Sequence, residues 1–480
     1  MGLMELKLED KDKQSSKIVA EDTRVVIRTP KANTTKEASR SCKSCFNRGN
    51  YEPIDSVVGH ETHLTYYRIV SCSINIEGYV HLSVVSSQHD NKLISFEGNP
   101  LNMSIEQARD FLHGLRVKAG IPRARKLKVL VNPVGGQGNA IRYYNERVFP
   151  ILRSSGCTVD LQKVLEYKLH AFDIAKEMDL SYDAIVCVSG DGAVHEVLNG
   201  FLHHQNPIKA IQTPLCPIPA GSGNSLSLCL LGLEEGFDIS LATLNAIKGH
   251  AMPLDLFSIM QGNKRTLSYL TQATGLMADL DIGTEDMRWL GDTRFVIGYV
   301  RSLVRNAPCP CEIYIKVEHD DKNQMVNWVR ERHLDTPVPV PQYTGSELPK
   351  VQYPNGPEFD WEKVSDDISY LYAGQVPWVS RDLKQFPVSM PNDGFIDVAV
   401  QLNVSRMQKI KAMDGAENGA MFFDDSLKYY KAKAYHFKPL QTDGYISIDG
   451  ESAPILPFTV EIMPSLARVL SPYYTWNNQF

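Results

Sequence analysis

The stretch SGDGAVHEVLNG, residues 189–200, follows directly on the apolar run AIVCV, residues 184–188. A short apolar run bounded by a turn predicts a buried strand, and the spacing in AVHEVLNGFL predicts a helix. Between them stands one aspartate, Asp191, flanked by Gly190 and Gly192. Glycine permits backbone conformations and close approaches that side chains forbid, at an entropic cost. The position therefore calls for a chemical reason.

Two further glycine-rich turns follow predicted strands, NPVGGQG at 132–138 and AGSGN at 220–224. From Lys126 onward strands alternate with helices, a pattern typical of βαβ units and a mostly parallel sheet. The carboxyl ends of such strands share one edge, where ligands bind. Backbone N–H groups in glycine turns and helix N-termini attract anions. The pattern predicts a site for a phosphate-bearing ligand, although neither a Walker A motif nor a G-x-G-x-x-G fingerprint is present.

Composition excludes several classes of protein. The net charge of −6 does not favour a nucleic-acid partner, which calls for a basic excess. The nine cysteines are odd in number and mostly lie in apolar runs, which indicates a reducing compartment. No apolar run is long enough to span a bilayer, and the N-terminus lacks the apolar core of a signal peptide. We therefore expect a cytoplasmic protein.

The chain divides into four predicted parts. Residues 1–50 are expected to be a disordered tail, in which seven Lys or Arg face the single acid Glu37 between Arg24 and Asn50. Residues 51–120 predict a small β-rich module ending in a helix capped by Ser104, compatible with a pleckstrin-homology-like fold. Residues 125–255 predict the α/β domain. Residues 256–472 predict a β domain, interrupted by a polar surface insertion at 318–365 that is a candidate for disorder.

The basic tail contains two cysteines, Cys42 and Cys45. One interpretation is lipidation beside a positive patch, two weak membrane signals that act together at the cytosolic face of a membrane. The alternatives are a plain solvated tail or half of a metal site. No second Cys/His pair with zinc spacing follows, which argues against zinc.

Six ordered segments carry a family resemblance. VNPVGGQGNA, VSGDGAVHEVLNG and PIPAGSGNSL resemble the signature segments of the diacylglycerol kinase catalytic-domain superfamily, which includes sphingosine kinases. GLMADLDIGTEDMRWLGDTRF, PNDGFIDV and DGYISIDGE are similar to its second domain. The resemblance implies a parallel-sheet α/β nucleotide domain, like that of phosphofructokinase and NAD kinase, followed by an antiparallel β-sandwich. The ADLD segment is closest to sphingosine (sphingoid long-chain base) kinases, and the tail is similar to fungal members.

The resemblance implies a site for ATP and Mg²⁺, although no dedicated metal-ligand cluster stands out. The residues that it assigns to the nucleotide are Asn132, Pro133, Gly135, Gly136, Gly138, Glu166, Ser189, Gly190, Gly192, Glu196, Gly221, Ser222, Gly223, Asn224, Arg288, Arg294, Gly450 and Glu451. Many relatives have Lys in the first loop, where this chain has Gln137 and Asn139. Phosphate charge must then be met by backbone N–H groups, Mg²⁺ and the two arginines.

Asp191 is the expected general base, because a carboxylate between two glycines can reach the proton of an attacking hydroxyl. The alternative is an Asx-turn or a helix N-cap. Ser189 and Asp191 are expected at the lipid hydroxyl, and Asp281 at the cationic amine of a sphingoid base. Asp279 and Asp281 are predicted on the same face of a strand, where a solvent-facing pair is the alternative. Asp393 and Asp397 either assist the site or are structural.

We therefore predict an ATP-dependent kinase that phosphorylates the primary hydroxyl of sphingoid bases. Within enzymes the rival interpretation is a diacylglycerol or ceramide kinase. Other rivals are an NAD kinase or phosphofructokinase relative, against which AGSGN and IDGE argue, and a non-enzymatic lipid-binding scaffold. The intact Asp191, glycine loops and arginines argue against the scaffold.

Overall fold

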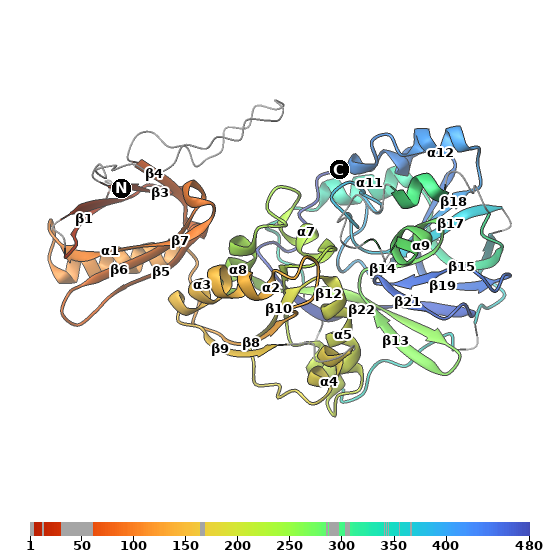
Figure 1. Ribbon diagram of the computed structural model, residues 1–480, viewed down its shortest axis with the longest axis horizontal. Helices are drawn as coiled ribbons and strands as arrows, with labels where there is room; N and C mark the ends of the chain where they lie inside the picture. The colour runs from red at the N-terminus through yellow and green to blue at the C-terminus, as the bar shows by residue number, and fades with distance from the viewer. Residues whose placement is uncertain are drawn as a thin grey trace. The chain divides into compact units, whose positions relative to one another are not determined.

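The computed structural model describes residues 4–11, 14–29, 61–163, 169–284, 287, 297–302, 308–339, 341, 343, 345–354, 356–364 and 367–480. The chain forms two compact units (Figure 1). The first comprises Met1–Ala124 with Arg147–Cys157, and the second Arg125–Glu146 with Thr158–Phe480. The predicted α/β and β domains therefore belong to one unit.

The first unit is a seven-stranded antiparallel sheet in the order β4-β3-β2-β1-β7-β6-β5. Its core packs Phe111, Leu112 and Leu115 of helix α1 against the strands. Ser104 and Gln107 form a capping box at the start of α1, which confirms the predicted cap. The elements are β1 (Met4–Glu9), β2 (Ser15–Ala20), β3 (Arg24–Arg28), β4 (Glu61–Thr65), β5 (Ile69–Ile74), β6 (Val80–Ser86), β7 (Lys92–Pro100) and α1 (Ile105–Lys118).

The predicted disorder of residues 1–50 is wrong for the three strands β1 to β3. Each is only five or six residues long and lies among polar residues, so it has little signal of its own. Pairing with neighbours buries Leu6, Ile18 and Val25 completely, which a window of local sequence does not reveal. Cys42 and Cys45 lie outside the described residues. The likeness to a pleckstrin-homology domain stays a prediction.

The α/β half of the second unit has the predicted parallel strands. β8 (Lys126–Val131) lies between β9 (Thr158–Lys163) and β10 (Ala184–Ser189), and β11 (Leu215–Pro219) pairs with β10. Every residue of β10 is buried, as its apolar run predicts. The helices are α2 (Ala140–Tyr143), α4 (His170–Lys176), α5 (Asp191–Leu202), α6 (Pro207–Ile211), α7 (Ser225–Leu231) and α8 (Ile239–Lys248).

The sandwich half continues the same sheet. β22 (Phe458–Ser471) pairs in parallel with β11 and antiparallel with β12 (His250–Gln261) and β19 (Leu427–Pro439). β12 runs unbroken across the predicted boundary at 255/256, so the two domains share a strand rather than a linker. The remaining strands are β13 (Lys264–Ser268), β14 (Thr271–Gly275), β15 (Cys311–His319), β16 (Glu362–Val364), β17 (Ile368–Gly374), β18 (Ile396–Leu402), β20 (Ile446–Ile448) and β21 (Glu451–Ala453).

The predicted insertion at 318–365 is partly regular structure. Asp321 caps helix α11 (Lys322–Glu331), which buries Met325 and Val326, and β16 pairs with β15. Disorder is therefore wrong for these elements, whose apolar residues are too few to stand out in a polar segment.

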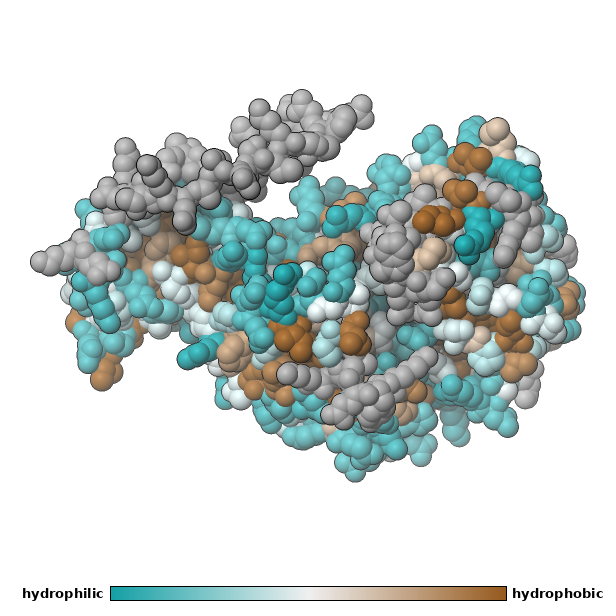
Figure 2. Space-filling view, viewed as in Figure 1, coloured by the Kyte–Doolittle hydropathy of each residue, from teal (hydrophilic) through white to brown (hydrophobic). Residues whose placement is uncertain are grey.

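Helix α12 (Arg406–Ala412) buries a charged side chain and exposes apolar ones, the reverse of the usual arrangement in a surface helix. It buries Lys409, whose Nζ lies 3.1 Å from the Asn403 side-chain oxygen, and exposes Met407 and Ile410. Figure 2 shows hydrophobic residues at the surface around α12. In the part of the chain that the structure describes, we find no helix with the length and apolar character needed to cross a membrane.

Candidate active site

The three glycine loops meet at one edge of the sheet. The Ala220 N–H donates to the Ser189 carbonyl at 3.0 Å, and the Asp191 N–H donates to the Gly223 carbonyl at 3.3 Å. A Cβ on Gly221 would lie 2.2 Å from the Gly190 Cα. The backbones are therefore packed as closely as glycine permits, in agreement with the predicted arrangement.

The first loop packs against the third. Gly136 has a φ of +57°, and a Cβ there would lie 2.7 Å from the Ala220 carbonyl oxygen. The Asn132 side-chain oxygen accepts the Gly135 N–H at 2.8 Å and so holds the start of this loop. At Gly138, also at positive φ, a Cβ would make only an ordinary contact, 3.8 Å from the Pro133 carbonyl oxygen. Close contact, not turn geometry alone, requires the glycine at 136.

The third loop is held by its own asparagine. Asn224 accepts the Gly221 N–H at 3.1 Å and donates to the Gly221 carbonyl at 2.8 Å. Of the other predicted residues of the three turns, Pro133 and Ser222 lie in the loops, and Gly192 is the second residue of α5. The three loops therefore pack against one another at the N-terminal ends of α5 and α7, and together they form what we call the glycine cradle.

Asp191 is the first residue of α5, but its carboxylate faces another helix. Oδ2 accepts the Ser225 N–H at 2.7 Å and Oδ1 accepts the Leu226 N–H at 3.2 Å, both from the first turn of α7. The alternative that it caps its own helix is wrong, because α5 has no side-chain cap. Burial raises the pKa of Asp191 to about 6, against the lowering effect of the two N–H groups. A carboxylate with such a pKa suits proton acceptance near neutral pH.

Two glutamates border the central loop. Glu196, in α5, accepts the Ala171 N–H at 3.1 Å, and burial, reinforced by the charge of Glu451, raises its pKa. Glu451 comes from β21 of the sandwich, and a Cβ on Gly192 would lie 3.4 Å from its Oε1. The turn with the sequence IDGE, residues 448–451, therefore lies next to the central glycine loop, as the resemblance implies. We call it the IDGE turn.

Asp281 ends the helix α9 (Leu276–Asp281), so the predicted strand is wrong. Gly275, at φ +63°, turns the chain out of β14 and into α9, and Asp279 and Asp281 then point about 200° apart around the helix axis. The Ser447 hydroxyl donates to the Asp281 Oδ2 at 2.5 Å. A Cβ on Gly450 would lie 3.9 Å from the same oxygen, so Asp281 adjoins the IDGE turn.

Sequence reasoning missed Asp449, which precedes Gly450. Its buried carboxylate accepts the His195 Nδ1–H of α5 at 2.8 Å, a contact between residues 254 positions apart. The only local signals were a histidine on the apolar face of a helix and an aspartate beside the recognised glycine and glutamate.

Other predicted residues fall elsewhere. Glu166, Arg288 and Arg294 lie outside the described residues. Asp393 and Asp397 accept hydrogen bonds from the buried Lys431 Nζ at 2.7 and 3.1 Å, which supports the structural alternative. Within the described ranges, no group of three or more His, Cys, Asp or Glu side chains is arranged to hold a metal ion.

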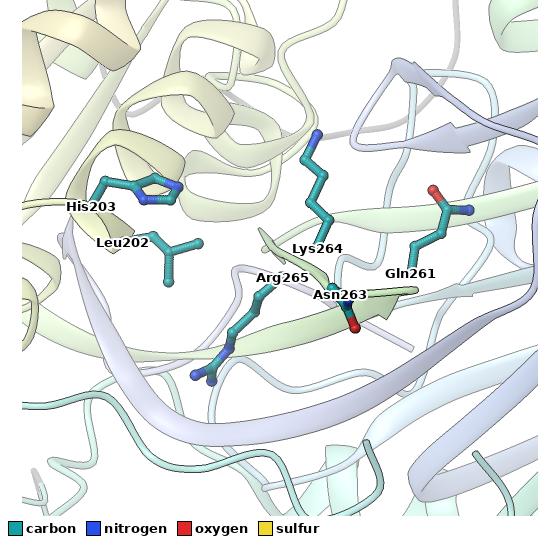
Figure 3. A pocket seen from close by; sticks show the side chains of 6 residues that line it. All are labelled: Leu202, His203, Gln261, Asn263, Lys264 and Arg265. Carbon is teal, nitrogen blue, oxygen red and sulfur yellow. The ribbon is translucent and has the colours of Figure 1, made fainter. Parts of the chain in front are cut away.

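A surface hollow of 770 Å³ lies away from the glycine loops. Leu202 and His203, at the far end of α5, line it together with Gln261, Asn263, Lys264 and Arg265 of the β12–β13 hairpin (Figure 3). The length of α5 separates it from Asp191 by about 18 Å. None of the predicted site residues lines this hollow.

Comparisons with known proteins show the family of this chain. Residues 126–259 match the diacylglycerol kinase catalytic domain, and residues 373–471 match the YegS C-terminal NAD kinase beta sandwich-like domain. Sphingoid long chain base kinase 4 of Schizosaccharomyces pombe is 33% identical over 360 residues, which are 74% of this chain and 76% of that protein. Sphingosine kinase 1 of Arabidopsis thaliana is 30% identical over 356 residues, 71% of each chain.

A solved structure supports the fold. The crystal structure of a diacylglycerol kinase from Bacillus anthracis str. Sterne matches with a TM-score of 0.50 at 19% identity, and covers 73% of this chain and 98% of that one. Fold, cradle and sequence relatives thus coincide: the chain belongs to the sphingoid long-chain base kinase family, within the diacylglycerol kinase catalytic-domain superfamily.

Proposed function

We propose that the protein transfers the γ-phosphoryl group of ATP to the primary hydroxyl of sphingoid long-chain bases such as sphingosine, sphinganine and phytosphingosine. The position of Asp191 carries this proposal. Its carboxylate lies beside the third glycine loop and accepts two N–H groups of α7, burial raises its pKa to about 6, and the relatives are named as sphingoid-base and sphingosine kinases.

In the proposed reaction the lipid hydroxyl oxygen attacks the γ-phosphorus. The bond from the γ-phosphorus to its bridging oxygen breaks, ADP leaves, and the hydroxyl proton passes to the Asp191 carboxylate. Ser189 adjoins the same turn, where its hydroxyl donates to the Gly190 carbonyl at 2.8 Å, and it is proposed to contact the lipid hydroxyl. This chemistry needs mainly positioning and neutralisation of charge.

The glycine cradle is proposed to bind the phosphates of a nucleotide. Gly136, Gly190 and Gly221 keep the three backbones close, because a Cβ at any of them would clash with a neighbouring loop. The N-terminus of α5 adds positive potential, whereas the first N–H groups of α7 are occupied by Asp191. Arg288 and Arg294 are proposed to bind the phosphates, with Glu166 near the adenosine side, Glu196 and Glu451 at the nucleotide. Mg²⁺ would arrive with ATP and neutralise phosphate charge.

Asp281 is proposed to bind the cationic amine of the sphingoid base. Its Oδ2 already accepts the Ser447 hydroxyl, which fixes the carboxylate beside the IDGE turn. Diacylglycerol and ceramide have no amine cation, so a fixed carboxylate favours the sphingoid base over both.

A lipid panel with radiolabelled ATP and Mg²⁺ tests the proposal. We expect phosphate transfer to sphinganine and little to diacylglycerol or ceramide. Asp281→Asn should raise the KM for sphinganine, while Asp279→Asn, on another side of α9, is the matched control. Turnover of diacylglycerol without turnover of sphinganine would contradict the proposal, as would equal effects of the two variants.

We also propose peripheral association with the cytosolic face of membranes, through lipidation of Cys42 and Cys45 beside the basic segment. The exposed Met407 and Ile410 of α12 are consistent with a membrane-facing surface. The double variant Cys42→Ser, Cys45→Ser should lower the membrane-bound fraction of the protein. An unchanged fraction would exclude lipidation at these positions.

A further inference from the structure

The proposed nucleotide site is assembled from two parts of the chain. Asp191 and the glycine loops come from the α/β half, whereas Gly450 and Glu451 come from the sandwich. The residue that immediately precedes the sandwich contribution is Asp449. Its side chain has no exposed surface, and its backbone is left-handed, with a φ of +51°.

All the described hydrogen bonds of the Asp449 carboxylate tie it to two segments. Oδ1 accepts the Ser268 hydroxyl at 2.6 Å and the N–H groups of Leu270 and Thr271, each at 3.0 Å. Oδ2 accepts the Tyr269 N–H at 3.1 Å and the His195 ring at 2.8 Å. One carboxylate therefore gathers the β13–β14 connection and helix α5 around the IDGE turn.

The ring of His195 is also held in place by a neighbour in the same helix, Asn199. The Asn199 Oδ1 accepts the Leu267 N–H at 2.9 Å and its Nδ2 donates to the Leu267 carbonyl at 2.9 Å, which fixes the orientation of the amide. The same Nδ2 also donates to the His195 carbonyl at 2.9 Å, so both of its hydrogens are taken by carbonyls, and the His195 Nε2 lies 3.3 Å away. Because the Asp449 carboxylate only accepts, Nδ1 carries a proton and donates to it at 2.8 Å.

A second connection runs from Asp449 to the proposed base. Tyr269 is fully buried; its N–H donates to Asp449, and its hydroxyl donates to the Asp191 carbonyl at 2.9 Å. His195 stands one helical turn after Asp191 in α5. Asp449 is therefore linked to the first turn of α5 along two independent routes.

We infer that Asp449, with His195 and Tyr269, is a positioning residue that sets the distance between Asp191 and the Gly450–Glu451 turn. It touches no reacting atom in this scheme. Its contacts with His195 and Tyr269 hold the Gly450–Glu451 turn next to the glycine loops. Residues of the α/β half and of the sandwich can then contact the same nucleotide. The inference rests on the proposed function for its choice of ligand.

Asp449→Asn tests it, because the amide keeps the shape but presents N–H where Oδ2 accepted His195 and Tyr269. We expect affinity for ATP with Mg²⁺, measured by direct titration, and kcat with sphinganine each to fall on the order of 10- to 100-fold, as small misplacements do. Asp255→Asn is the matched control. Asp255 is also fully buried and accepts two backbone N–H groups, from Gly394 and Ser465, remote from α5.

A pair of substitutions at His195 decides the case if Asp449→Asn does not fold. Asparagine keeps a donor at the place of Nδ1, so His195→Asn should retain most of the nucleotide affinity that His195→Leu loses. Equal affinities in these two variants, or an Asp449→Asn protein that binds ATP and turns over like the unmodified chain, would overturn the inference. If the unmodified protein binds ATP without phosphorylating sphinganine and Asp449→Asn still weakens ATP binding, only the proposed function fails.

Discussion

Two regions of the second unit gather carboxylates, and they treat them differently. In the sandwich, Asp393 and Asp397 form ion pairs with the fully buried Lys431, whose ammonium group compensates their negative charge. At the glycine loops, the described partners of the Asp191 carboxylate are two backbone N–H groups of α7. Both regions are stable parts of one fold, but only the second leaves a carboxylate held by dipoles rather than by a salt bridge.

The difference separates a structural cluster from a reactive one. Burial raises the pKa of Asp397 to about 6 as well, against the lowering charge of Lys431, so the pKa does not separate the two regions. What differs is that Asp397 is held by the Lys431 ammonium group and the Tyr429 hydroxyl. A carboxylate held by N–H groups beside a cradle keeps its orientation, and burial brings its pKa to about 6. Position alone does not distinguish the two, since both stand next to glycine turns in the sequence; their partners do.

The largest effect is expected on kcat, from a substitution of Asp191 at the glycine loops. Asp191→Asn removes the proton acceptor, and we expect kcat with sphinganine to fall by roughly 10²- to 10⁴-fold, the range typical of general bases. The amide still accepts one N–H from α7, so the protein should stay folded. The measurement is turnover with saturating ATP and lipid, beside a thermal unfolding curve. Residual activity close to that of the unmodified protein would remove Asp191 from the role of base.

The second prediction concerns stability, and it removes the cation of the Asp393–Asp397–Lys431 cluster. Lys431→Met leaves two buried carboxylates without their cation, and we expect the free energy of unfolding to fall by about 3–5 kcal/mol. Below the new unfolding transition, kcat should change little. Lys438→Met, on the same strand β19, is the control, because Lys438 pairs with Glu312 at the surface. Denaturant titration measures both. Equal stability of the two variants would show that Lys431 does not hold the cluster.

Local sequence predicted the cradle but not the contacts that close it. The three loops follow short buried strands, and a parallel sheet brings such loops together whatever the rest of the chain does. The strand β10 and the helix α5 were therefore predictable from twelve residues and their apolar neighbours. The Asp449–His195 contact joins residues 254 positions apart. It depends on how the sandwich strands bring Asp449 back to α5, which no local sequence pattern encodes.

Failures of prediction have the same cause. Strands β1 to β3 are too short to stand out, and gain their apolar core only by packing with β4 to β7 and α1. GLMADLD, residues 275–281, has apolar residues that suit either a strand or a helix, and a single glycine at positive φ decides for the helix. Sequence indicated that Asp281 belongs to the site, but not the face that it occupies.

The smallest expected effect is the pH dependence of kcat, compared between the unmodified protein and Lys431→Met. A base must be unprotonated to act, so kcat should be constant above the pKa of Asp191, about 6, and fall as pH drops through it, approaching tenfold per unit below. The amine of the substrate keeps its proton over this range, because alkyl amines titrate near pH 10. Lys431→Met should leave the midpoint unchanged, since its cluster is separate from the base. A profile that stays flat down to pH 5, or a midpoint that moves in Lys431→Met, would mean that another group controls the rate and that the two regions are not independent.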